Sequence, residues 1–88
     1  MDRRLGFVGI IVEDRAAAAA AVNRILSEHG DLILARTGIP RAHGNTSVIT
    51  LAIEATTDEL GRLTGQLGQV PGIAVKSGLG RPESGGRS

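Results

Sequence analysis

The chain has 88 residues, ten of them basic and nine acidic, and a net charge of +1. A chain this short forms one small domain and buries only about 60% of its unfolded surface, so disulfides, a metal or oligomerisation usually add stability. It contains no cysteine, which excludes disulfides, thiolate metal sites and cysteine nucleophiles. Two histidines are too few for a histidine-only metal cage. We therefore expect no metal and no cofactor, and oligomerisation remains.

The composition also argues against several kinds of partner. Without a block of like charge, the chain has no general attraction for nucleic acids or anionic membranes. Phe7 is the single aromatic residue, so there is no platform for stacking bases. No apolar run approaches the roughly 20 residues of a membrane span, and the N-terminus lacks a signal-peptide core. These features predict a soluble cytoplasmic protein with no membrane partner.

The first predicted element is a strand over Leu5 to Val12, a short apolar run rich in β-branched residues. Odd and even positions are both apolar, which predicts a strand buried on both faces. Gly6 and Gly9 inside it suggest that a neighbouring backbone approaches closely.

A helix follows, with Asp14 as a favourable N-cap and six alanines as strong helix formers. Its apolar residues fall on one stripe at helical spacing: Ala18, Ala21, Val22, Ile25 and Leu26. His29 lies in the last turn, where the helix dipole favours an imidazolium. Gly30 supplies the position that ends the helix.

Two strands come next, over Asp31 to Ile39 and over Asn45 to Ala55. In the second of them, alternating positions separate into two faces. The five residues between the strands include Pro40 and Gly44, a length typical of a hairpin connection.

The last elements are a second helix and a short fourth strand. Thr56 and Glu59 have the spacing of a capping box, and the buried stripe is Leu60, Leu63 and Leu67. Gly68 ends this helix, and a turn leads into a strand over residues 72–77. The tail, residues 79–88, consists mainly of glycine, serine and charged residues, a composition that predicts disorder.

This order of elements predicts an α+β fold, the ferredoxin-like βαββαβ sandwich over residues 1–78. Its antiparallel sheet has the strand order 4-1-3-2, and both helices lie on one face. Because the first strand is apolar on both faces, the opposite face exposes a patch, and such patches usually mark interfaces. We expect a homo-oligomer, a dimer or a tetramer; the alternative is a monomer that tolerates a weakly apolar surface.

Candidate binding residues gather at two places. Glu13 and Asp14 end the first strand and could bind a metal or an amine, although capping and the helix dipole explain them as well. Arg36 and Arg41 flank the hairpin and could hold an anion with backbone N–H groups; a polar hairpin end is the alternative. His43 is a possible ligand or a solvated loop residue. No catalytic signature is visible, and we expect no enzyme activity.

Three stretches carry a resemblance to a known family: GFVGIIVEDR, EHGDLILARTGIPR and LGQVPGIAVKSGL. Over about residues 3 to 79 the chain resembles the iron-only ([FeFe]) hydrogenase system regulators. This family is similar to ACT domains and to the C-terminal half of nickel-responsive repressors. The nickel ligands and the ribbon-helix-helix DNA reader of those repressors are absent here, so neither nickel binding nor direct DNA binding by this chain alone is expected.

The resemblance implies a homo-oligomeric transcriptional regulator of the [FeFe]-hydrogenase system that senses a small-molecule effector. By analogy with ACT domains, the effector would bind at the first strand-to-helix turn and the neighbouring hairpin. The tentative ligand-binding residues are Val12, Glu13, Asp14, Arg36, Gly38, Pro40, Arg41 and His43. The alternative is a ligand-free protein-interaction or assembly module that acts on a hydrogenase-system maturation partner.

Overall fold

The computed structural model describes residues 2–13 and 16–81, except for the side chains of residues 41–43. The elements are β1 (Arg4–Val12), α1 (Ala16–Glu28), the 3₁₀ turn η1 (Gly30–Leu32), β2 (Ile33–His43), β3 (Thr46–Ala55), α2 (Thr57–Gly68) and β4 (Ile73–Leu79). They form one antiparallel sheet in the order β2-β3-β1-β4. The predicted ferredoxin-like order of strands and helices is confirmed.

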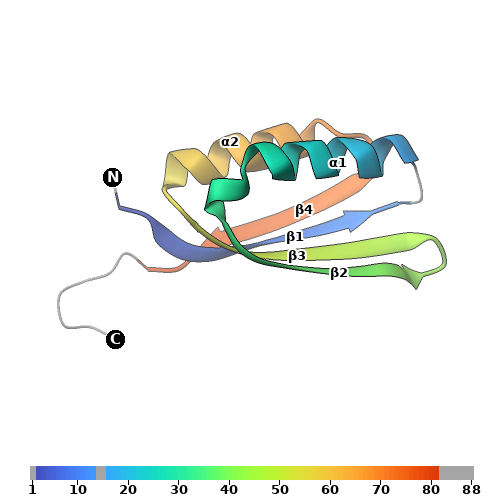
Figure 1. Cartoon of the computed structure of the whole chain (residues 1–88), viewed down its shortest axis with the longest axis horizontal. Helices are drawn as coiled ribbons and strands as arrows, with labels where there is room; N and C mark the ends of the chain where they lie inside the picture. Colours follow the sequence, from blue (N-terminus) through green and yellow to red (C-terminus); the bar gives the residue numbers. More distant parts are fainter. Residues whose placement is uncertain (1, 14–15, 82–88) are drawn as a thin grey trace.

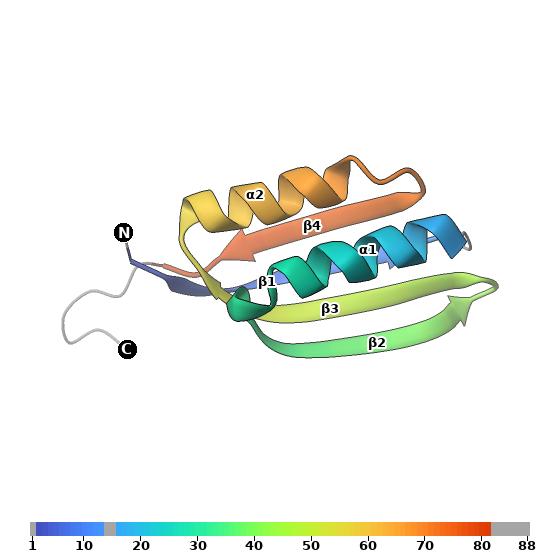
Figure 2. The same cartoon turned by 45° about the horizontal axis from the view of Figure 1, so that its top comes forward.

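The molecule has two layers. In Figure 1 both helices lie on the same side of the sheet, and Figure 2 shows α1 and α2 side by side above the strands. The other face of the sheet is uncovered along its whole length (Figure 1). This face is called the open face below, and the helix-covered one the covered face.

The core lies between the helices and the covered face. Alternation along β1 sends Val8, Ile10 and Val12 into it, and β3 adds Leu51 and Ile53. The helices contribute the rest of their buried stripes: Ala18, Val22, Ile25, Leu26, Leu63 and Leu67. Of the residues expected on these stripes, Ala21 and Leu60 are only half-buried.

The end of α1 differs from the prediction. The helix stops at Glu28, and the N–H of His29 donates to the carbonyls of Ile25 and Leu26, both at 3.2 Å. Gly30 does not take a left-handed conformation; it begins η1 instead. The chain therefore leaves the helix through a tighter 3₁₀ turn, which is common at helix ends. Asp14, the expected N-cap, lies outside the described residues.

The hairpin between β2 and β3 is tighter than predicted. The expected five-residue connection from Pro40 to Gly44 is wrong, because β2 continues to His43 and the turn holds only Gly44 and Asn45. Gly44 has φ +61°, as two-residue hairpin turns require. Pro40 fits inside β2 because this strand is at the edge of the sheet and its register shifts between Ile39 and His43.

The beginning of α2 is as predicted. Thr56 Oγ1 accepts from the Glu59 N–H at 3.1 Å, and the Glu59 carboxylate accepts from the Thr56 N–H at 2.8 Å, a complete capping box. Arg3 donates twice to the same carboxylate, at 3.1 and 2.9 Å. These bonds join the chain's first residues to α2.

The final strand runs past its predicted end at residue 77 and includes Leu79, the first residue of the predicted tail. Gly72, with φ +85°, turns the chain into β4. Leu79 ends β4, and the N–H of Gly80 donates to the carbonyl of Leu5 at 2.7 Å. Of the tail expected from residue 79 onward, residues 82–88 lie outside the described part of the chain.

Candidate functional site

A small groove opens between α1 and the part of the β2–β3 hairpin that lies next to its turn. Its volume is about 240 Å³. Nearly all of its surface is apolar, and the side chains and backbone that line it include Val12, Ala19, Pro40, Val48 and Ile49. We call it the hairpin groove. It is smaller than the roughly 300–1,000 Å³ of drug-sized ligand sites, so it suits a small apolar group.

One polar pair marks the rim of the hairpin groove. Asn23, on α1, lines the groove, and its Oδ1 accepts a hydrogen bond of 2.6 Å from Nη2 of Arg36. Arg36 lies on β2 with its backbone opposite Leu51. The guanidinium has five N–H donors in total, so donors remain for an anionic group at the rim. A carboxylate is the planar partner that an arginine binds with two parallel hydrogen bonds.

The structure brings together about half of the predicted binding residues. Val12, Gly38 and Pro40 line the hairpin groove, and Arg36 reaches its rim through Asn23. Strand β1 ends where the hairpin of β2 and β3 also ends, and this shared edge places the residues together (Figure 2).

The other predicted residues are not part of this cluster as described. Glu13 is exposed, and its N–H donates to the carbonyl of Gly72 at 2.9 Å, which ties it to the turn before β4. Asp14 lies outside the described residues. Arg41 and His43 belong to the end of β2, but their side chains are outside the described part.

Sequence reasoning missed the contribution of α1 to the groove. Ala19 and Asn23 line it and are four residues apart, which places them on one face of a helix. Asn23 is polar and lies off the apolar stripe, a pattern that predicts the solvent side of the helix. The useful signal was this i, i+4 pair of a small and an amide side chain on a helix that follows Val12.

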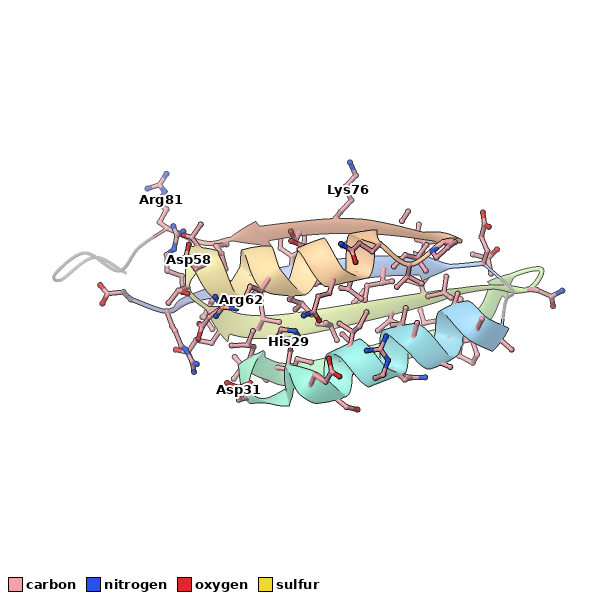
Figure 3. The ribbon with its side chains drawn as sticks, turned by 90° about the horizontal axis from the view of Figure 1, so that it is seen from above. His29, Asp31, Asp58, Arg62, Lys76 and Arg81 are labelled. Atoms are coloured by element: carbon pink, nitrogen blue, oxygen red, sulfur yellow. The ribbon has the colours of Figure 1, made fainter. Side chains whose placement is uncertain are left out.

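A second and larger depression, of about 570 Å³, lies between α1 and α2. Ala17, Ala21 and Val70 contribute small or aliphatic side chains to it. Just after α1 ends, Nε2 of His29 lies 3.1 Å from Oε1 of Gln66, in the last turn of α2. Figure 3 shows His29 between the two helices, so its described contact is structural and joins them.

Neither a metal site nor a membrane-spanning helix is found in the described part of the chain. Residues 2–13 and 16–81 contain no group of three or more histidine, aspartate or glutamate side chains placed to hold a metal ion. Within the same ranges, neither helix is long and apolar enough to cross a membrane.

The open face carries the exposed apolar residues that the sequence predicted. Its large members, with the exposed fraction of each, are Leu5 (65%), Phe7 (56%), Ile11 (48%) and Ile39 (53%). They belong to β1 and β2, and the half-buried Val48 of β3 lies opposite Ile11. Four large apolar side chains about half exposed on one sheet face form the kind of patch that marks an interface.

This architecture defines the class of the protein: a small α+β module with the ferredoxin-like fold. The ACT domain from the GTP pyrophosphokinase of Chlorobium tepidum superimposes with a TM-score of 0.69 at 23% identity, over 85% of this chain and 97% of that one. The C-terminal domain of the MgtC protein from Mycobacterium tuberculosis gives 0.70 at 21% identity, over 90% and 89%. At these identities the similarity shows the fold alone. No curated protein sequence matches the chain.

A more similar structure is that of TM1266 from Thermotoga maritima, with a TM-score of 0.85 and 36% identity over 89% of this chain and 98% of that one. Residues 4–77 match the TM1266-like family of iron-only hydrogenase system regulators. The chain belongs to that family, as the resemblance in its sequence predicted.

Proposed function

We propose that this protein is a non-catalytic, cytoplasmic regulatory module of the iron-only hydrogenase system that senses a small effector in the hairpin groove. Membership of the regulator family and the ACT-like fold support the regulatory role. The observation that carries the effector site is the meeting of Val12, Gly38 and Pro40 in one groove with the Arg36–Asn23 pair at its rim. The working unit is a homo-oligomer.

The chemistry of the hairpin groove indicates the kind of effector. Its walls are aliphatic and its volume is about 240 Å³, so they accept a short branched or linear hydrocarbon group. Arg36 supplies the positive charge at the rim. The ligand class that matches both is a small aliphatic carboxylate, with its hydrocarbon part in the groove and its carboxylate at Arg36.

The test begins with native mass spectrometry of the purified chain, which reports a co-purified ligand directly. Isovalerate, valine and butyrate are then titrated while backbone amide NMR shifts are recorded. We expect shifts around Val12, Ala19 and Gly38. In Arg36→Ala, the affinity for the responding carboxylate falls at least about tenfold, because the ligand loses a charge-assisted hydrogen bond.

Arg24→Ala is the matched control. Arg24 is an exposed arginine of α1 that pairs with Glu28 at 3.6 Å and does not line the hairpin groove. Its removal leaves the shifts unchanged. The effector site is wrong if no carboxylate moves the groove resonances, or if Arg36→Ala and Arg24→Ala respond alike.

A second function is favoured by the open face. Four large apolar side chains about half exposed there support a ligand-free assembly module that docks on a protein of the hydrogenase system. Stoichiometric capture of a purified maturation protein, lost in Phe7→Ser and kept in Arg36→Ala, would favour this function. The opposite pattern would favour effector sensing.

A further inference from the structure

On the open face, the residues beside Phe7 on the neighbouring strands are small. Around the central strand β1, Phe7 lies opposite Ala52 on β3 and Gly78 on β4, and Gly9 lies opposite Thr50 and Lys76. A Cβ added to Gly78 would lie 3.0 Å from Cε1 of Phe7, so the aromatic ring lies across the glycine. Phe7 is therefore a large side chain surrounded by small ones, and it stands above the middle of the face.

Within β1, β3 and β4 the open face carries one positive and one negative charge, Lys76 and Glu54. Lys76 projects from β4 away from both helices in Figure 3. Glu54 points the same way from β3, because its neighbours Ile53 and Ala55 are fully buried on the covered face. Neither charge has an ion-pair partner within the described part of the chain.

The two charges lie at equal distances from Phe7, on opposite sides of it. Glu54 lies opposite Leu5 and Lys76 lies opposite Gly9, on the two strands that flank β1. Phe7 is midway between Leu5 and Gly9. With strands about 4.8 Å apart and a rise of about 3.3 Å per residue, the two charges are about 16 Å apart with Phe7 at their midpoint.

We propose that the open face binds a second copy of this chain across a two-fold axis that passes over Phe7. The axis lies between the two sheets and is perpendicular to the line from Glu54 to Lys76. This rotation places Lys76 of each copy over Glu54 of the other and stacks the two Phe7 residues. The strands of the two copies cross at roughly 70°, close to the orthogonal class of sheet packing.

The energetics of such an interface divide between apolar and charged groups. Burial of Phe7, Ile11 and Ile39 supplies the attraction. The two Lys76–Glu54 pairs set orientation and choice of partner more than affinity. Sheets that pack face to face lie about 10 Å apart, a gap that an extended lysine and an extended glutamate span together. Such an interface is isologous, because both copies use the same surface patch to contact each other.

This inference rests on the homo-oligomer proposed above and specifies its interface. The test uses Lys76→Glu and Glu54→Lys, measured by native mass spectrometry and by dilution with light scattering. In either variant alone, the homodimer brings like charges together twice. We expect its dissociation constant to rise at least about 100-fold over the wild type.

Mixing the two variants is the decisive step. In the mixed pair, the Lys76→Glu chain offers two carboxylates and the Glu54→Lys chain offers two ammonium groups, so both ion pairs form. An equimolar mixture therefore yields heterodimers with at least about tenfold higher affinity than either homodimer. Arg62→Glu, a charge reversal on the exposed surface of α2, is the control and leaves the oligomeric state of the wild type unchanged.

Several results overturn the inference. They are a wild-type chain that stays monomeric at high concentration, an oligomer that both charge reversals leave intact, and variants that dissociate but do not pair on mixing. Each is separable from failure of the effector site, because the carboxylate titration with Arg36→Ala is read from the groove resonances at any oligomeric state. Circular dichroism of each variant confirms that the fold is kept.

Discussion

Strand β1 contributes to both faces of the sheet, and the two faces differ in what covers them. On the covered face Val8 and Ile10 have no exposed surface, because both helices pack on them. On the open face Leu5 and Phe7 are equally apolar but keep 65% and 56% of their surface exposed. The same strand thus holds the fold together through one set of positions and leaves the other available for a partner.

The covered face therefore mainly determines the stability of the single chain, and the open face mainly determines how chains associate. Substitutions on the covered face should lower the free energy of unfolding of the single chain. Substitutions on the open face should mainly change how chains associate. The predictions below test that division, from the largest expected effect to the smallest.

The largest effect is expected for Ile10→Ala. Ile10 is fully buried in the core, and truncating such a side chain to a methyl group costs about 2–5 kcal/mol through lost burial and the cavity that remains. Urea unfolding followed by circular dichroism measures the change. A domain this small has a total stability of only about 5–15 kcal/mol, so the variant should lose a large part of it.

The matched substitution on the other face is Phe7→Ala. Measured at a concentration where chains are monomeric, it should cost clearly less than Ile10→Ala, although it removes a larger side chain. Equal losses for the two variants would contradict the division between the faces, because they would mean that the open face stabilises the single chain as strongly as the core does.

A smaller effect is expected for Gly6→Ala, which tests the packing of β1 against β4. A Cβ at Gly6 would collide with the backbone carbonyl of Gly78, and the side chain of Leu79 would be 2.7 Å away. Forcing the two strands apart should cost about 1–3 kcal/mol. Gly9→Ala is the control on the same strand, since the nearest atom there, the Lys76 carbonyl oxygen, is 3.9 Å away; its unfolding midpoint should stay close to wild type.

The two glycines also show what can be learned from the sequence. Their place inside a strand predicts close approach of a neighbour, and this prediction is confirmed for Gly6 and wrong for Gly9. The pattern of apolar residues predicts the order of strands and helices, from which the ferredoxin-like strand order follows, and the spacing of Thr56 and Glu59 predicts the capping box. The pattern is not enough to say which neighbour each residue meets.

The candidate site is only partly predictable for the same reason. Val12, Gly38 and Pro40 are predicted from the resemblance to ACT domains and to the regulator family, and the strand ends that carry them meet at one edge of the sheet. Asn23 cannot be predicted in this way, since the approach of α1 to the hairpin depends on helix position. The extension of β2 past Pro40 also cannot be predicted from the local sequence. A proline is tolerated in an edge strand, and whether a strand lies at the edge depends on the whole sheet.

The smallest effect on stability is expected from Glu59, whose carboxylate binds Arg3 at the start of α2. A hydrogen bond from the Arg3 side chain, followed by the backbone N–H of Thr56, lowers the pKa of Glu59 from 4.5 to about 2. Because the folded-state pKa is depressed, the contribution of Glu59 to stability is fully present above about pH 4.5. It is lost as the pH falls through 2.

Glu59→Gln should therefore unfold at lower urea than the wild type at pH 7, and the two unfolding midpoints should converge as the pH approaches 2. Urea titrations at several pH values between 2 and 7 measure this. Glu28→Gln is the control, because Glu28 is more than half exposed and 3.6 Å from its partner Arg24. A gap between Glu59→Gln and wild type that stays constant down to pH 2 would show that the carboxylate acts through packing or capping geometry and that its charge contributes nothing to the link between Arg3 and α2.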